Sequence, residues 1–208
     1  MSWMKALVVM AVAALSGPVM AETWDLEIGP LAGATSFDAG LSDYRWDTTP
    51  RFESGLETTM GQGRWRAGLR FLRSQTTQGT GLELGTADPT VRATNGALLG
   101  RVLAAQPAGI GIWVTAHAGW LHLGYTPDQV SFDSVTVNFE PVDELALGGG
   151  LALRRTLGNS WALALSGEAS TFALDTAHRQ GDEIVFQRDR FWNWSARLAV
   201  TWRISLGS

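Results

Sequence analysis

The most regular feature of this sequence is an alternation of apolar and polar residues with a period of two. Near the end of the chain, the even-numbered residues from Trp192 to Ile204 are apolar, and most of the odd-numbered residues between them are polar. The same alternation occurs over residues 24–29, 52–60, 64–71, 145–153 and 161–165, and less cleanly over 92–104 and 110–124. Because successive side chains of a strand point to opposite faces, the pattern predicts about eight strands. A bulge near Trp120–Leu121 would explain the irregular pattern of residues 110–124.

The segments between these strands alternate in length. Residues 61–62, 106–109 and 158–160 are short and carry the Gly, Pro and Asn residues of tight turns, whereas longer polar stretches lie near 38–50, 76–91, 126–142 and 175–189. Short turns at one rim and long loops at the other are typical of an up-and-down barrel whose two ends face different compartments. The fold class is therefore expected to be all-β, an eight-stranded antiparallel up-and-down transmembrane β-barrel over residues 22–208.

Alternation alone does not say which face of a barrel is inside, so a soluble barrel of the lipocalin type is the alternative. Tryptophan positions favour the membrane. Five of them are expected to form an aromatic girdle at one membrane interface, because they begin or end strands at the short-turn rim: Trp24, Trp65, Trp113, Trp161 and Trp202. The stripes between them consist of Leu, Ala, Val and Gly, which suit contact with lipid.

Charged residues fall on the polar face of the strands. A charge that faces lipid near the midplane costs about 2–4 kcal/mol, so these side chains are expected to point into the lumen. An eight-stranded interior is just wide enough for side chains to fill it, and opposed charges would plug it; a lined path for small solutes is the alternative. The expected lumen charge network comprises Glu53, Glu57, Arg66, Arg70, Arg154, Glu168, Arg197 and Arg203.

One strand register can be predicted from a turn. Gly61 and Gln62 are expected to form a two-residue type II′ turn, since glycine tolerates the positive φ of its first central position. Glu57 then faces Arg66, and Glu53 faces Arg70, on the lumen side. Such opposite charges form favourable cross-strand pairs.

The amino terminus resembles a signal peptide. Lys5, the one lysine of the chain, precedes the apolar run 6–15, and Val19-Met20-Ala21 suits cleavage after Ala21. Ten apolar residues are too few for a membrane-spanning helix, which needs roughly 20. Residues 1–21 are therefore expected to be removed after export.

Composition excludes several chemistries. The chain has no cysteine, 17% charged residues and a net charge of −4, which argues against disulfides, cysteine-ligated metals and nucleic acid as a partner. His117 and His122 are five residues apart, hence on opposite faces of a regular strand, and His178 lies in a long loop. No nucleophile elbow, phosphate loop or zinc-protease motif occurs, and Ser166, Glu168 and His122 have no catalytic spacing. No cofactor or metal is expected.

With its signal peptide, its alternating strands and its closing segment 191–204, the sequence resembles the small Gram-negative outer-membrane β-barrel proteins, the OmpA-, OmpX- and OmpW-like group. The resemblance covers the whole mature chain and implies insertion in the outer membrane, contact with its lipid and lipopolysaccharide, and recognition of the last strand by the barrel assembly machinery. Members of the group usually end on an aromatic residue, whereas this chain continues after Ile204 with Ser205-Leu206-Gly207-Ser208.

Within that group, the expected function is non-enzymatic: a structural, adhesive or surface-contact role through four long loops. Aromatic residues of these loops, namely Tyr44, Trp46, Phe132, Phe139 and Phe186, would either bind a surface partner or rest on the barrel rim. Two alternatives remain open. One is a lipid A-modifying enzyme, although the His-x-Ser-Asn run of the deacylases is absent near the last strand. The other is a narrow channel or carrier, for which Gly148-Gly149-Gly150 could allow lateral opening.

Overall fold

The computed structural model of the chain describes residues 24–79, 88–132, 135–180 and 183–206. Its elements, in chain order, are β1 (Trp24–Phe37), η1 (Ala39–Tyr44), β2 (Arg51–Gln62), β3 (Trp65–Thr77), β4 (Thr90–Ala105), η2 (Pro107–Gly109), β5 (Ile110–Thr126), β6 (Gln129–Phe132), β7 (Val135–Asn138), β8 (Val142–Leu157), β9 (Trp161–Gln180) and β10 (Glu183–Leu206). The expected signal peptide lies outside the described residues. Among the described residues, no helix is long and apolar enough to cross a membrane.

Eight of the strands form a closed antiparallel barrel, as the alternation predicts. Their order around the barrel is β1-β10-β9-β8-β5-β4-β3-β2, so β1 pairs with both β2 and β10 and no edge is left open. Sequence neighbours lie side by side throughout the ring, apart from β6 and β7, which form a separate two-stranded hairpin between β5 and β8. Closure satisfies the backbone hydrogen bonds within the wall, which is the condition for crossing lipid with strands.

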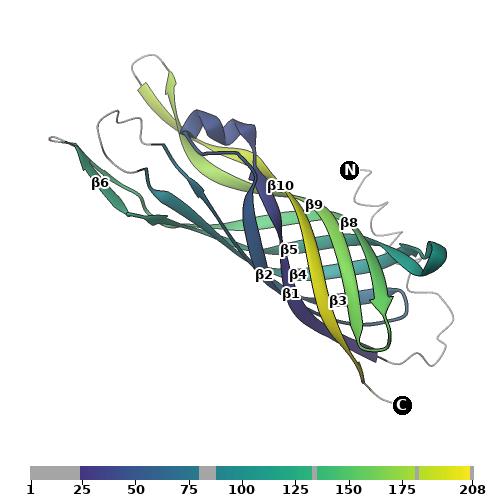
Figure 1. The fold of residues 1–208 in the computed structure, drawn as a ribbon. Coiled ribbons are helices and arrows are strands. Elements are labelled where there is room, and N and C mark those ends of the chain that lie inside the picture. The colour runs from purple at the N-terminus through teal and green to yellow at the C-terminus, as the bar shows by residue number, and fades with distance from the viewer. Residues whose placement is uncertain (1–23, 80–87, 133–134, 181–182, 207–208) are drawn as a thin grey trace, which may run out of the picture.

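The two ends of the barrel differ, as the loop lengths indicate. Tight connections between β2 and β3, β4 and β5, and β8 and β9 lie at one rim, which is called the inner rim below. The opposite, outer rim carries η1, the β6–β7 hairpin and the far ends of β9 and β10 (Figure 1). Two of the stretches expected to be loops, 126–142 and 175–189, therefore contain strands. The β6–β7 hairpin lies in the first, and β9 and β10 extend into the second, where they stay paired as far as Gln180 and Glu183.

The outer surface of the barrel is apolar, and tryptophans border it at both rims. Near the inner rim, Trp24, Trp161 and Trp202 are 48–52% exposed, and Trp161 lies directly opposite Trp202. Trp65 begins β3 on the same face as Leu69. Near the outer rim, a second group comprises Trp120, Trp192 and Trp194. Ten residues separate Trp192 from Trp202, about 33 Å along a strand or about 25 Å along the normal of a tilted barrel, which matches an apolar membrane band.

Trp113 is the exception, and its assignment to the girdle is wrong. Its side chain is only 4% exposed and points into the lumen, on the same face of β5 as Thr115 and His117. The position of Trp113 near the start of a strand suggested the girdle, but strand alternation decides the face, and Trp113 alternates with the outward-facing Val114. Gly111 makes room for the ring, because a Cβ there would lie 2.5 Å from the indole Nε1.

Two details of the predicted strand pairing are also wrong. The β2–β3 turn consists of Gly63 and Arg64, with a φ of 54° at Gly63, so Glu57 faces Arg70 and Glu53 faces Ser74. The turn lies two residues further along the chain than predicted, so each β2 residue faces a β3 residue four positions further on. An even shift leaves every side chain on its predicted face, so alternation could not detect it. The irregularity in β5 is not at Trp120–Leu121: the register shift lies between Leu103 and Ala105 of β4.

The register of β2 and β3 can be tested by cross-linking, because the chain has no cysteine of its own. We expect cysteines introduced at Thr58 and Leu69, which lie directly opposite each other, to form a disulfide when the folded barrel is oxidised. Cysteines at Thr58 and Trp65 are the matched control, because a turn at Gly61-Gln62 would pair them. In the observed register they lie about 13 Å apart along the strand. Cross-linking of the control pair instead, measured by a shift in gel mobility, would contradict the observed register.

Candidate functional site

The lumen contains every charged residue that alternation assigned to it, together with four residues that were missed. Six of the eight, Glu53, Glu57, Arg66, Arg70, Glu168 and Arg197, are buried, whereas Arg154 and Arg203 are partly exposed near the inner rim. Asp25, Glu27, Arg101 and His117 are buried there as well. Asp25 and Glu27 lie on the polar face of the alternating stretch 24–29, so the pattern contained the signal that locates them.

The middle of the lumen is crossed by a chain of four charges. Arg70 Nη1 donates to Glu168 Oε1 at 2.8 Å, and Arg197 Nη1 donates to Glu168 Oε2 at 2.8 Å. Arg197 also binds Glu53 through its Nε, and His117 Nδ1 lies 3.5 Å from Glu168 Oε2. Since β3 and β9 occupy opposite positions in the ring of eight, the Arg70–Glu168 bond spans the full width of the barrel. These four side chains therefore tie β2, β3, β9 and β10 together.

A separate pair lies beside this chain. Arg101 Nη1 and Nη2 donate to the two carboxylate oxygens of Glu57 at 2.6 and 2.8 Å, the bidentate geometry that guanidinium groups favour. The middle lumen thus holds three carboxylates and three arginines. The two pairs predicted between neighbouring strands, Glu57–Arg66 and Glu53–Arg70, do not form, because the long arginine side chains reach partners on strands further around the narrow barrel.

A second network lies toward the inner rim. Arg66 Nη2 lies 3.3 Å from Asp25 Oδ2 and 3.0 Å from Glu27 Oε1. Arg203 Nη2 donates to the same oxygen of Asp25 at 2.5 Å, and Arg154 binds Glu27. Two carboxylates are therefore shared among three arginines.

Gly148, Gly149 and Gly150 have a packing role in this wall. All three pair without interruption to β5 on one side and β9 on the other, so the ladder shows no lateral opening there. A Cβ at Gly148 would lie 2.5 Å from the imidazole of His117, and one at Gly150 would lie 2.9 Å from Cγ of Glu168. The glycines leave the space that the central charges occupy.

The outer half of the lumen is filled by apolar side chains. Leu41 of η1 and Trp46 lie inside the barrel among Phe37, Phe172 and Phe191. The remaining members of this apolar plug are Val91, Ala93, Leu121, Leu123 and Ala146. The loop that carries Leu41 and Trp46 thus folds inward and covers the lumen.

Hydrogen bonds hold that loop in place. Trp46 Nε1 donates to Gln78 Oε1 at 2.8 Å, the Asp47 N–H donates to the Thr77 carbonyl at 2.9 Å, and the Trp46 ring meets Phe37 edge to face at 5.7 Å. Hydrogen bonds from the hydroxyl and backbone N–H of Thr49, together with Arg51, lower the pKa of Asp47 to about 2. Of the five loop aromatics, Trp46 therefore rests in the barrel rather than on a partner; the side chains of Tyr44 and Phe132 lie outside the described part of the structure.

The space between the plug and the charge network is small. A pocket of about 30 Å³, lined among others by Arg70, His117, Leu121 and Phe172, has room for about one water molecule. The middle and outer parts of the described lumen are therefore occupied by side chains, with the charges in the middle and the apolar groups toward the outer rim.

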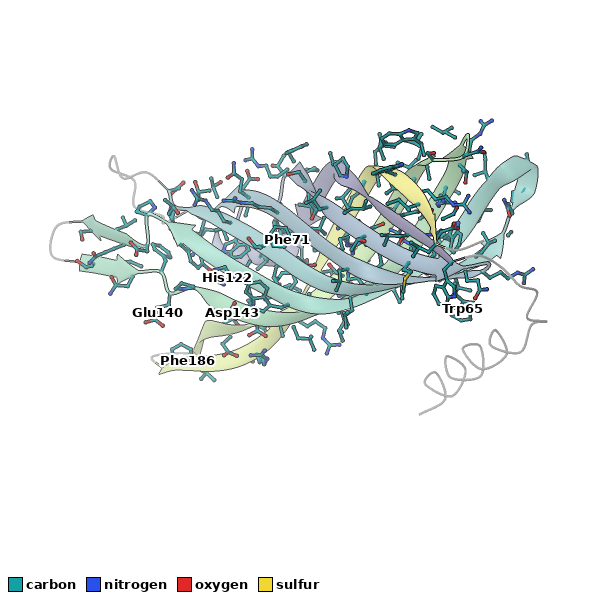
Figure 2. All side chains as sticks on the ribbon, turned by 90° about the horizontal axis from the view of Figure 1, so that it is seen from below. Trp65, Phe71, His122, Glu140, Asp143 and Phe186 are labelled. Carbon is teal, nitrogen blue, oxygen red and sulfur yellow. The ribbon has the colours of Figure 1, made fainter. Side chains whose placement is uncertain are left out.

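His117 and His122 do not form a joint site, and the side chain of His178 lies outside the described part of the structure. His117 lies in the lumen, whereas His122 is on the outer surface, where His122 Nδ1 and Trp120 Nε1 both contact Asp143 Oδ1, at 2.8 and 2.7 Å. Figure 2 shows His122 and Asp143 together on the outer-rim side of the barrel, far from Trp65. Ser166 and Glu168 are on the inner face, so the strand wall separates them from His122. Among the described residues, no three His, Asp or Glu side chains form a group that could hold a metal ion.

The Glu57–Arg101 pair allows a test of what the buried charges contribute. We expect Arg101→Met to lower the free energy of unfolding by about 3–5 kcal/mol, because it leaves the Glu57 carboxylate unpaired in the lumen. The double change Glu57→Gln and Arg101→Met should cost clearly less, since it removes both charges. The measurement is urea unfolding of the barrel refolded into lipid vesicles.

Arg51→Met provides the surface control, because the exposed Arg51 pairs with the partly exposed Asp47. Its unfolding midpoint should equal that of the wild type. A double variant as unstable as the single Arg101→Met variant would show that the charge pair itself, rather than the stranded carboxylate, is responsible.

Comparison with known proteins gives matches in structure only. Models of known protein families do not match the chain, and neither do the sequences of curated proteins. Among solved structures, the crystal structure of Neisserial surface protein A (NspA) matches with a TM-score of 0.52 at 6% sequence identity, covering 88% of this chain and 97% of that chain.

Two further solved structures align over similar lengths. The outer membrane protein OprG from Pseudomonas aeruginosa matches with a TM-score of 0.48 at 11% identity, covering 89% of this chain and 98% of that chain. Ail, the attachment invasion locus protein of Yersinia pestis, matches with a TM-score of 0.46 at 13% identity, covering 88% and 99%. The closed eight-stranded ring, its apolar exterior and the match to NspA agree: the chain has the fold of the small outer-membrane β-barrel proteins, and such an exterior belongs in the outer membrane.

Proposed function

We propose that this outer-membrane barrel is a non-enzymatic surface-contact protein whose lumen serves as a rigid support for its outer hairpins. The observation that carries this proposal is the filled lumen, with a charge network in the middle and an apolar plug sealed by Leu41 and Trp46 above it. A barrel that is closed inside acts through its ends. Its longest strands, β9 and β10, and its additional hairpin, β6–β7, all project at the outer rim (Figure 1).

The charge of the sequence segments between the barrel strands on the long-loop side indicates the kind of partner. Residues 38–51, 73–92, 126–144 and 175–190 together carry fourteen acidic residues and seven arginines, and the segment 126–144 carries five acidic residues and no basic one. An excess of charge of one sign steers encounters with surfaces that carry charge of the opposite sign. The outer end therefore suits a cationic partner.

The projecting hairpins also carry apolar side chains and are braced at their base. Phe186 is 75% exposed and Val137 is 39% exposed, and Figure 2 shows Phe186 and Glu140 at the projecting end. Arg188 of β10 binds Glu144 of β8 and lies 3.2 Å from Asp175 of β9, and these carboxylates raise the pKa of Arg188. The bracing supports presentation of a defined surface.

The absence of catalysis is part of the proposal. His122 and Asp143 are the nearest approach to a catalytic pair, but among the described residues no hydroxyl donates to the second ring nitrogen of His122. A nucleophile would have to be hydrogen-bonded there to be activated. The pair is better explained as a polar contact at the membrane surface, beside Trp120, whose ring stacks on His122 at 5.5 Å.

The closed lumen predicts electrical behaviour. We expect the purified protein to give no stable conductance steps in planar lipid bilayers, because the arginine–carboxylate chain and the apolar plug leave no continuous water path. A large trimeric porin recorded under the same conditions is the positive control. Large, stable single-channel steps from the wild-type barrel would overturn the support role of the lumen.

The contact role predicts binding to a cationic surface. We expect the full chain in phosphatidylcholine nanodiscs to bind immobilised polylysine, with an affinity that falls as salt rises, and to bind heparin much less. Asp128→Asn combined with Glu140→Gln should weaken polylysine binding several-fold, whereas Arg64→Gln at the inner rim should leave it unchanged. Surface plasmon resonance would measure these affinities. Equal binding to polylysine and heparin, or no effect of the double change, would refute the cationic-partner proposal.

A further inference from the structure

The lumen opens toward the inner rim into a vestibule of about 450 Å³. Its lining includes Asp25, Arg66, Trp113, Arg154 and Arg203. This vestibule lies at the end of the barrel opposite the outer hairpins.

The charges around the vestibule do not balance. Deeper in the lumen, Glu53, Glu57 and Glu168 match Arg70, Arg101 and Arg197 one to one. Among the described residues of the vestibule, two carboxylates, Asp25 and Glu27, face three arginines, Arg66, Arg154 and Arg203. Arginine stays charged in proteins, so the described residues at this end of the lumen have a surplus of one positive charge.

Guanidinium donors at the vestibule also lack acceptors in the described part of the chain, as do donors of Arg70 and Arg101 deeper in the lumen. Arg66 is 93% buried, and its Nη1 has no acceptor among the described residues. Nε of Arg203 also lacks one. Buried donors are normally satisfied, and an unsatisfied one costs about 1–3 kcal/mol, more when it is charged. One carboxylate or phosphate group at this position would supply both the missing charge and the missing acceptors.

We infer that this vestibule is a binding site for a phosphate-type oxyanion presented at the inner rim. The guanidinium groups of Arg66, Arg154 and Arg203 hold it, because their planar forks match the oxygens of a phosphate, and the indole of Trp113 forms an adjacent wall. Asp25 and Glu27 orient the three arginines and leave room for a single negative charge. The ligand chemistry is the same for free inorganic phosphate and for the headgroup of an anionic phospholipid.

The test uses the full chain in phosphatidylcholine nanodiscs, with inorganic phosphate as the first probe and nanodiscs that contain phosphatidylglycerol as the second. We expect saturable binding of at least one probe, followed by ³¹P NMR line broadening and by calorimetry. Binding of inorganic phosphate identifies a site for free oxyanions, and binding of phosphatidylglycerol alone identifies a site for lipid headgroups. No saturable binding of either probe would overturn the inference.

Three variants make the test specific. Arg203→Gln should weaken binding about tenfold or more, because it removes the surplus charge and a donor group. Gln106→Glu adds a carboxylate to the vestibule lining and should also weaken binding, since the protein then supplies its own anion. Arg155→Gln is the matched control. Arg155 follows the vestibule residue Arg154 in β8 but faces outward, so its loss removes one positive charge and should leave binding unchanged.

Heat-modifiable migration in gels verifies that each variant is folded before binding is measured. Gln106 is exposed, so the Gln106→Glu variant tests the vestibule even where Arg203→Gln fails to fold. Equal loss of binding in the Arg155→Gln control would show that net charge, not the vestibule, attracts the anion, and would overturn the inference.

Discussion

The structure depends on one electrostatic constraint: a charge in the lumen of an eight-stranded barrel must have a partner of opposite sign. The interior is too narrow for a column of water, so each side chain that enters it loses solvent. Arg70 and Glu168 meet across the whole width of the barrel, and Arg197 joins Glu168 to Glu53. The same bonds that satisfy these charges connect distant strands of the ring, so charge pairing and wall rigidity have a common cause.

The requirement for space explains features that otherwise look unrelated. Gly148 and Gly150 lie where a side chain would collide with His117 or Glu168, and Gly111 leaves room for the inward-facing Trp113. Between the charges and the outer rim, Leu41 and Trp46 enter the lumen from the first outer loop and complete an apolar plug. The two ends of the molecule consequently differ. The outer end is sealed and acidic, whereas the inner end is open and has more arginines than carboxylates.

Part of the candidate site could be found from the sequence, and part could not. Alternation places Glu53, Glu57, Arg70 and Arg197 inside, because the face of a strand residue is a local property. Asp25 and Glu27 follow the same rule. Arg101 and His117 lie in segments where the alternation is blurred by inward-facing apolar residues such as Leu99 and Leu121, which belong to the lumen and not to the lipid surface.

The period-two pattern and the turn residues specify the eight strands of the barrel, the face of most side chains, the short-turn and long-loop rims, and the apolar exterior. The tertiary structure alone decided the register of β2 and β3, the partners of the buried arginines, the inward position of Trp113 and the plug made by Leu41 and Trp46. A shift of the pairing by an even number of residues leaves every face unchanged, so the pattern alone could not fix it. The pairing of charges, in turn, depends on which strands stand opposite each other once the barrel has closed.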